Sequence, residues 1–200
     1  MRGKEGIFER AIRGIQRAKG CPGIKVMINS VFSKLNLGAV EGLVHLADEL
    51  GVPIYLCPIE TGIGRAGFAE SKEGLGASPQ ELEEFARTVM GLKRRGFRIN
   101  NSLTYLRTFI GGKKPFRCHT QKVAVSIDAN GDVKNCIARE PFGNVSRTPL
   151  REILESERVR QARRQSESCH ACNNPDVIDC SYVWELRPES VWSFARVFLD

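Results

Sequence analysis

The chain has 200 residues, of which 42% are hydrophobic and 26% are charged. These values are typical of an ordinary globular protein with one or two domains. No apolar run approaches the roughly 20 residues that a membrane-spanning helix needs. The opening residues also lack the apolar segment that a signal peptide requires. The composition therefore predicts a cytoplasmic protein without a membrane partner.

The formal net charge of +7 permits an acidic partner such as a nucleic acid. The cations are spread along the chain, and their one local concentration, Arg158 to Arg164, falls on a predicted helix. A solvated helix face explains such a run, and no aromatic-rich strand accompanies it to form a base-stacking surface. Nucleic acid is therefore not the expected partner.

The first half of the chain alternates helical and strand patterns. Apolar residues at helical spacing predict a helix over residues 7–18. Short apolar runs between turn signals predict buried strands at residues 24–29 and 52–57. A helix capped by Asn36 and ending at Gly51 connects these strands, so they are expected to be parallel.

A glycine-rich stretch, residues 61–77, then predicts an open loop above a sheet or barrel rim. Its Gly62-Ile63-Gly64 is not continued at dinucleotide-binding spacing, so it indicates a phosphate-binding loop only weakly. Ser78-Pro79-Gln80-Glu81 is a capping box that begins a third helix. A strand at residues 97–100 and a helix at residues 103–110 complete an α-β-α-β-α-β-α order.

Three strands are too few for a closed barrel, which needs about eight. The first strand would also leave an apolar edge without a pairing partner. The pattern therefore predicts an α/β layer that a partner covers, or that forms the later part of a larger design. Residues 111–115, with two glycines and a proline, are the expected linker to the second half.

Seven cysteines carry the main chemical signal. Their odd number and the lack of an export signal argue against a disulfide framework. Cys21 and Cys57 are most simply a turn residue and a core residue. The other five predict a metal site in a reducing compartment: Cys118, Cys136, Cys169, Cys172 and Cys180.

A hairpin is expected to bring the first two of these cysteines together. Alternating apolar residues predict a strand at residues 123–127, and Asn130-Gly131 predicts a tight turn. The returning strand at residues 133–137 carries Cys136. Because the chain doubles back, Cys118 and Cys136 lie at the same end of the hairpin.

The second pair forms a Cys-x-x-Cys clamp, Cys169 to Cys172, after a helix predicted over residues 148–166. Four thiolates from two separated pairs can hold tetrahedral zinc or a cubane iron–sulfur cluster, and their spacing does not separate the two. Cys180 follows a predicted polar turn at residues 173–176. It could be a fifth thiol, a replacement ligand or a buried apolar residue.

His119 and His170 each neighbour a candidate ligand. A supporting or surface role explains both histidines more simply than ligation does.

Several segments of the chain resemble a known family. One set resembles the middle of the radical S-adenosylmethionine (SAM) barrel: residues 2–11, 26–31 and 46–54. A second set resembles the SPASM or twitch auxiliary domain of the same family: residues 126–136, 142–145, 148–154 and 169–172. In that family the auxiliary cysteines ligate a four-iron cluster. The resemblance thus implies a 4Fe-4S cluster on Cys118, Cys136, Cys169 and Cys172, with Cys180 ambiguous. A full SPASM domain needs more cysteines, so the single-cluster twitch form fits better.

The chain departs from the family at one decisive motif. The Cys-x-x-x-Cys-x-x-Cys that holds the SAM-cleaving cluster is absent from the sequence, as is the glycine-glycine-glutamate segment that binds the methionine end. The resemblance therefore implies a partial parallel (β/α) barrel at residues 1–112 and a small α+β iron–sulfur domain at residues 113–200. A truncated reading frame, or a separate polypeptide that supplies the missing half-barrel, would account for the absence. Three residues would border SAM only in a complete barrel: Asn29, Leu56 and Cys57.

The expected function is the iron–sulfur-binding C-terminal portion of a radical SAM enzyme. Its auxiliary cluster would engage a peptide or small-molecule substrate, or exchange electrons with a donor, and the chain alone would not cleave SAM. The alternative is a zinc-stabilised module that binds nucleic acid or protein through the same four cysteines and Arg158 to Arg164. A self-contained α/β enzyme lacks a recognisable nucleophile–base pair.

Overall fold

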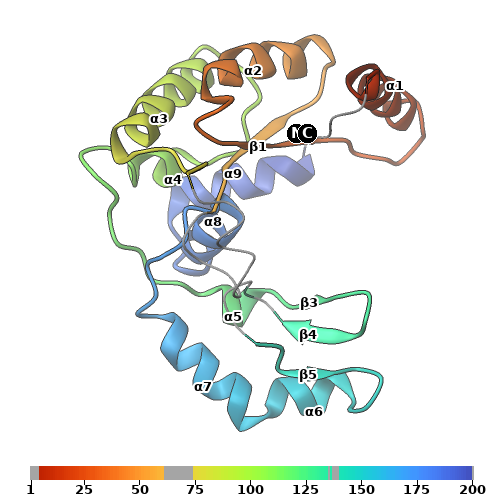
Figure 1. The fold of residues 1–200 in the computed structure, drawn as a ribbon, viewed down its shortest axis with the longest axis vertical. Coiled ribbons are helices and arrows are strands. Elements are labelled where there is room, and N and C mark those ends of the chain that lie inside the picture. Colours follow the sequence, from red (N-terminus) through yellow and green to blue (C-terminus); the bar gives the residue numbers. More distant parts are fainter. Residues whose placement is uncertain (1–4, 61–73, 135, 137–139, 200) are drawn as a thin grey trace.

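The computed structural model describes residues 5–60, 74–134, 136 and 140–199 (Figure 1). Most of the predicted glycine-rich loop, residues 61–73, lies outside the described residues. The fold is mixed α/β, with helices around a two-stranded parallel sheet and a three-stranded antiparallel sheet. Every described helix is too short or too polar to cross a lipid bilayer.

Helix α1 (Ile7–Lys19) confirms the first predicted helix. Strand β1 (Ile28–Phe32) pairs in parallel with β2 (Ile54–Pro58), as expected, with Ile28 opposite Ile54. The first strand begins four residues later than predicted. Its start is set by its partner, because the Ile28 N–H donates to the Pro53 carbonyl just before β2 begins.

The connection between the two strands contains η1 (Leu37–Ala39) and α2 (Val40–Glu49). Asn36 stands at the N-cap position of η1, but its side chain forms no capping hydrogen bond there, and Ala39 precedes α2. Asn36 Oδ1 instead accepts a hydrogen bond of 2.7 Å from the Ser33 N–H and closes the turn before the helix. The helix ends as expected before Gly51, whose φ of +65° favours glycine.

The capping box of α3 (Pro79–Arg94) is confirmed, with Ser78 Oγ accepting from the Glu81 N–H at 3.2 Å. The predicted third strand is reduced to one parallel bridge between Ile54 and Ile99. The Asn101 side chain replaces further backbone pairing, because it bonds both Leu56 N and Leu56 O, at 2.9 and 2.8 Å. Helix α4 (Leu103–Arg107) follows and is shorter than predicted.

The predicted hairpin forms as β3 (Ser126–Ile127) and β4 (Asp132–Lys134), and β5 (Gly143–Asn144) extends the sheet. Gly131 in its turn has a φ of +83°. Two parts of the prediction were wrong. Val123 belongs to a helical turn, α5 (Thr120–Val123), and Cys136 lies beyond the returning strand, which ends at Lys134.

The single helix predicted over residues 148–166 is two helices, α6 (Leu150–Glu155) and α7 (Glu157–Ser166). Ser156 separates them because its backbone is extended and its side chain caps α7, accepting from the Val159 N–H.

The predicted polar turn at residues 173–176 instead begins α8 (Pro175–Trp184). Asn174 caps this helix, and Pro175 occupies its first position. Helices α8 and α9 (Pro188–Leu199) contact α4 and lie apart from the β3–β5 sheet (Figure 1). The C-terminal helices thus pack against the first half of the chain.

A continuous apolar core joins β1, β2, α2, α3, α4 and α8. Among its most buried members are Phe32, Leu56, Phe85, Leu106 and Ile178. Among the described residues no strand other than β2 pairs with β1, so the structure shows an α/β layer and no barrel.

Candidate metal centre

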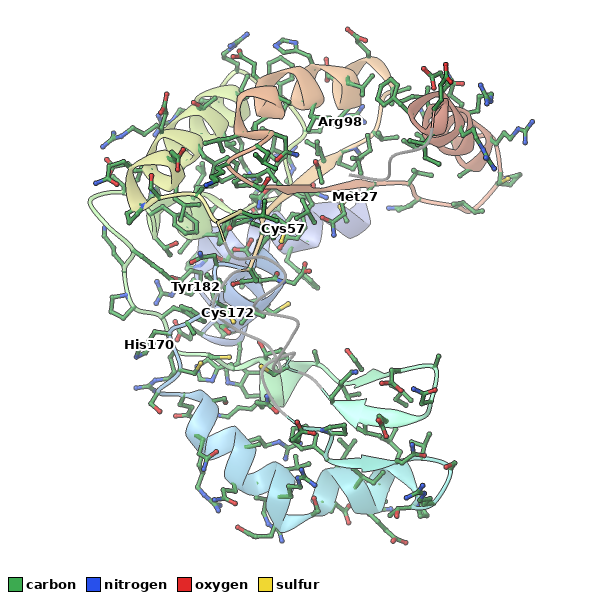
Figure 2. All side chains as sticks on the ribbon, in the orientation of Figure 1. Met27, Cys57, Arg98, His170, Cys172 and Tyr182 are labelled. Atoms are coloured by element: carbon green, nitrogen blue, oxygen red, sulfur yellow. The ribbon has the colours of Figure 1, made fainter. Side chains whose placement is uncertain are left out.

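The Cys-x-x-Cys loop, residues 169–173, is fastened to the α/β layer at three of its residues, His170, Ala171 and Asn173. His170 Nδ1 contacts the Phe116 carbonyl, and the Lys113 ammonium donates to the Ala171 carbonyl at 3.0 Å. The Asn173 N–H donates to Glu60 Oε1 at 2.7 Å, and its carbonyl accepts from the Tyr105 hydroxyl at 2.8 Å. These contacts hold the loop just beyond the C-terminal end of β2 (Figure 2).

Cys118 is brought to the same place by the end of α7. The Ser166 hydroxyl donates to the Cys118 carbonyl at 3.2 Å, three residues before Cys169. The Arg163 guanidinium also donates to the Gln121 carbonyl at 3.1 Å. The two contacts tie the segment that carries Cys118 to the helix that leads into the Cys-x-x-Cys loop.

The four thiols of the two pairs share one electrostatic neighbourhood. Burial raises the pKa of the Cys172 thiol to about 12, and the nearby Glu60 adds to the rise. Three further thiols contribute to the same rise: Cys136, Cys169 and Cys118. Within the part of the chain that the structure describes, no three His, Cys, Asp or Glu side chains already stand in a metal-binding arrangement. The other three thiols thus lie within electrostatic reach of Cys172, without forming a closed coordination shell.

Cys180 faces other groups. It lies on α8, where burial raises the pKa of its thiol, and the carboxylates of Asp176 and Asp179 add to that effect. Tyr55 on β2 lies within the electrostatic reach of Cys180 as well. The surroundings of Cys180 are therefore a carboxylate pair on its own helix.

The two histidines that neighbour candidate ligands are held by other contacts. His119 is buried, with Nε2 3.4 Å from Glu185 Oε1, and its backbone N–H donates to Ser181 Oγ at 2.9 Å. His170 contacts the Phe116 carbonyl, as described above. Each ring thus has a structural partner, and the buried His119 Nδ1 has no hydrogen-bond partner among the described residues.

The residues expected to border SAM lie along the parallel sheet. Asn29 is exposed on β1, and Cys57 is buried at the end of β2. Leu56 is fully buried, and both of its backbone polar groups bond the Asn101 side chain. Its side chain therefore serves the core.

Sequence reasoning missed Glu60 and Lys113, which both meet the Cys-x-x-Cys loop. Glu60 follows a buried parallel strand by two residues, and that position is a common place for functional polar groups in α/β folds. Lys113 lies in the expected linker, where no pattern distinguishes it. Burial lowers the pKa of Lys113, whereas Glu60, Cys172 and Cys169 raise it.

One comparison with known families bears directly on this site. Residues 118–173 match the SPASM iron–sulfur cluster-binding domain. The matched stretch, called the SPASM segment below, begins at Cys118, contains Cys136, Cys169 and Cys172, and ends before Cys180. No curated protein matches the chain. The match supports a cluster-binding role.

The donor set of the SPASM segment fits an iron–sulfur cluster. Cysteine thiolates are the ordinary ligands of such clusters. Three of the thiols lie within electrostatic reach of the buried Cys172, and the Lys113 cation lies within reach of Cys172 and Cys169. Binding of iron would lower the high pKa of Cys172, because a coordinating thiol is deprotonated by the metal charge.

Proposed function

We propose that the SPASM segment holds a 4Fe-4S cluster through Cys118, Cys136, Cys169 and Cys172. We further propose that the chain is the later portion of a radical SAM enzyme, in which this cluster engages substrate or relays electrons. The observation that carries the proposal is the match of residues 118–173 to an iron–sulfur domain, with the four cysteines inside it and three of their thiols within electrostatic reach of Cys172.

A bound cluster would supply a one-electron redox centre. The described residues would determine the charge and the burial around it. Lys113 holds the Ala171 carbonyl between the paired thiols and contributes a positive charge that favours the thiolate form. Glu60 fixes the residue after Cys172 through the Asn173 N–H. Burial of Cys118 and Cys172 limits the access of water to their sulfurs.

The parallel β1–α2–β2 unit supports the radical SAM part of the proposal. The edge of β1 that faces away from β2 would accept the missing strands from a further polypeptide segment, and Val31 and Met27 near this edge are 56% and 43% exposed. In the completed barrel, Asn29 and the end of β2 at Leu56 and Cys57 would border SAM. The substrate would be a peptide or small molecule, with an external electron donor.

Anaerobic purification after iron–sulfur reconstitution tests the cluster. We expect a brown protein with about four irons and about four sulfides per chain. The Cys172→Ser variant is expected to lose most of this iron, whereas Cys21→Ser, a matched change at an exposed thiol, is expected to keep it. A colourless protein with about one zinc per chain would make this a zinc-stabilised binding module instead.

The radical SAM part has a separate test, because the Cys-x-x-x-Cys-x-x-Cys motif is absent from the sequence. The reconstituted chain, reduced and supplied with SAM, is expected to form no 5′-deoxyadenosine. Its formation would contradict the assignment of this chain to the later portion of the enzyme.

A further inference from the structure

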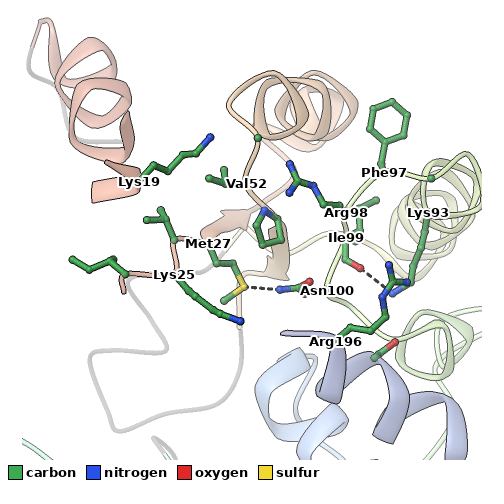
Figure 3. Close-up of a pocket in the computed structure, with 16 residues that line it drawn as sticks. Lys19, Lys25, Met27, Val52, Lys93, Phe97, Arg98, Ile99, Asn100 and Arg196 are labelled. Atoms are coloured by element: carbon green, nitrogen blue, oxygen red, sulfur yellow. Dashed lines mark hydrogen bonds between the residues drawn. The ribbon is translucent and has the colours of Figure 1, made fainter. Parts of the chain in front are cut away.

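A second candidate site lies at the other end of the parallel strands. A cavity of about 490 Å³ is lined by the segment before β1, the turn before β2 and residues 96–100 (Figure 3). Met27 directly precedes β1, and Pro53 directly precedes β2. The cavity is therefore at the N-terminal ends of the strands, whereas Glu60 and the thiols follow the C-terminal end of β2.

Positive charge dominates this cavity. Among the described residues that line it there is no aspartate or glutamate, but there are five cations: Lys19, Lys25, Lys93, Arg98 and Arg196. Such an excess without carboxylates concentrates a positive potential in a concave space. The cavity therefore favours an anion.

Lys19 and Arg98 converge beside Gly51. A β-carbon placed on Gly51 would lie 2.8 Å from Lys19 Nζ and 3.7 Å from Arg98 Nη2. Lys19 donates to the Leu50 carbonyl, which leaves further ammonium protons for a ligand. Neither side chain forms an ion pair with any described carboxylate. The ends of Lys19 and Arg98 thus lie close to the same space beside Gly51, which a larger side chain would otherwise fill.

The opposite wall is formed by Lys93 and Arg196 (Figure 3). Lys93 Nζ donates to the carbonyls of Ile99 and Asn101, at 2.8 and 2.7 Å, so its position is fixed. Burial lowers the pKa of Lys93, Glu189 and Asp179 raise it, and the charge of Arg196 lowers it again. Lys93 thus holds residues 99 and 101 in place and adds a cation to this wall of the cavity.

The two carboxylates near Lys93 are held outside the cavity. Glu189 accepts hydrogen bonds from the Leu103 and Thr104 N–H groups, at 2.8 and 2.9 Å. Asp179 accepts from the Ser102 N–H at 3.2 Å and from the Ser102 hydroxyl. Both carboxylates therefore cap the start of α4, and neither pairs with Lys19 or Arg98.

We propose that this cavity binds a small organic phosphate, with the phosphate on Lys19 and Arg98. A guanidinium and an ammonium together suit a dianionic phosphate, because the planar guanidinium can donate two parallel hydrogen bonds. Val52 and Met27 offer an apolar wall for the organic part, and Asn100 Nδ2 holds the Met27 sulfur at 2.9 Å. The volume falls within the usual range of small-molecule sites.

Titration calorimetry on the reconstituted full chain, at low ionic strength, tests the proposal with phenyl phosphate as the probe. We expect phenyl phosphate to bind more tightly than inorganic phosphate, and phenol to give no binding. Arg98→Gln should weaken phenyl phosphate binding by about tenfold, the loss that one charge-assisted hydrogen bond produces. Lys19→Gln, on the exposed face of α1, should weaken it similarly and provides a second variant if Arg98→Gln does not fold.

Arg94→Gln is the matched control. It removes the same charge from a separate basic hollow that Arg94 forms with Arg87 and Lys114, and binding should be unchanged. Equal weakening by Arg94→Gln and Arg98→Gln would mean that phenyl phosphate responds only to the overall positive charge of the protein. That result would contradict the proposed site. The absence of phenyl phosphate binding, or binding unaffected by both Arg98→Gln and Lys19→Gln, would overturn it as well. None of these outcomes depends on the iron content of the SPASM segment.

Discussion

The α/β layer, residues 24–116, and the SPASM segment, residues 118–173, are stabilised in different ways. The layer contains a continuous core with fully buried side chains on both strands and three helices. Between the terminal cysteines, the SPASM segment buries only four apolar side chains among the described residues, and none belongs to that core: Val133, Ile153, Val159 and Ala162. Its strands are two or three residues long.

A sheet of such short strands with so few buried side chains is marginal in water. The contacts that fasten the SPASM segment are instead polar and concentrated at its two ends, where Cys118 and Cys172 join the core of the layer. A bound cluster would add folding free energy at this point, because metal sites are not formed in the unfolded chain. One region is thus stable through its core, whereas the other buries little and would gain stability from a bound cluster.

The largest expected effect is therefore on the SPASM segment when iron is removed. In the metal-free protein, backbone amides of residues 126–134 and 140–168 should exchange hydrogen much faster than in the reconstituted protein, whereas amides of α3 and β2 should change little. Hydrogen-exchange mass spectrometry of the two forms measures the difference. An equal loss of protection in both regions would contradict the idea that only the SPASM segment depends on the cluster.

A core substitution should act on the layer instead. Phe85 is 3% exposed, and its ring centroid lies 4.2 Å from that of Phe32. Phe85→Ala is expected to cost about 3–5 kcal/mol of unfolding free energy, through lost burial and the cavity left behind. Urea unfolding measures this, with Phe8→Ala on exposed α1 as the control, for which a change below about 1 kcal/mol is expected. Similar losses from both variants would argue against a core-stabilised layer.

The contact between α8 and α4 should make stability depend on pH. Burial raises the pKa of Asp179 from 3.8 to about 6, although the Ser102 hydrogen bonds oppose the rise. A carboxyl whose pKa is higher in the folded state binds more protons there. Its contribution is therefore fully present below about pH 4 and is lost as the pH rises through about 6, by about 2–3 kcal/mol.

Asp179→Asn should remove this component, because its amide does not titrate. Denaturant unfolding at several pH values between about 4 and about 7 would show a flatter profile for the variant than for the wild-type chain. Parallel profiles would show that Asp179 is not the group responsible.

The smallest expected effect is the loss of stability when a helix cap is removed in either region. Ser78→Ala removes the capping box of α3 and should cost about 1 kcal/mol. Ser156→Ala removes the cap of α7, where the hydrogen bond to the Val159 N–H is longer, at 3.4 Å, and should cost less. Thermal unfolding of both variants tests the order, and the reverse order would place more of the stability in the SPASM segment.

Features with a local cause were predictable from sequence. The capping box at Ser78 and the turn at Gly131 depend on residues within a few positions of each other, and both formed as expected. The iron–sulfur domain was recognisable for the same reason, because its motifs are short and closely spaced. The break at Ser156 was missed, since a single serine within an otherwise helical pattern can either cap a helix or lie on its surface.

The sequence by itself thus determined the order of helices α1 to α4, the parallel pairing of β1 with β2 and the cysteine pattern that marks the SPASM segment. Only the tertiary structure showed that Asn101 replaces a third strand, that Glu60 and Lys113 hold the Cys-x-x-Cys loop, and that five cations meet at the N-terminal ends of the strands. The physical reason is the distance along the chain. Periodicity and capping report on neighbouring residues, whereas a polar side chain that bonds a backbone group 45 or 113 residues away leaves no pattern in the sequence.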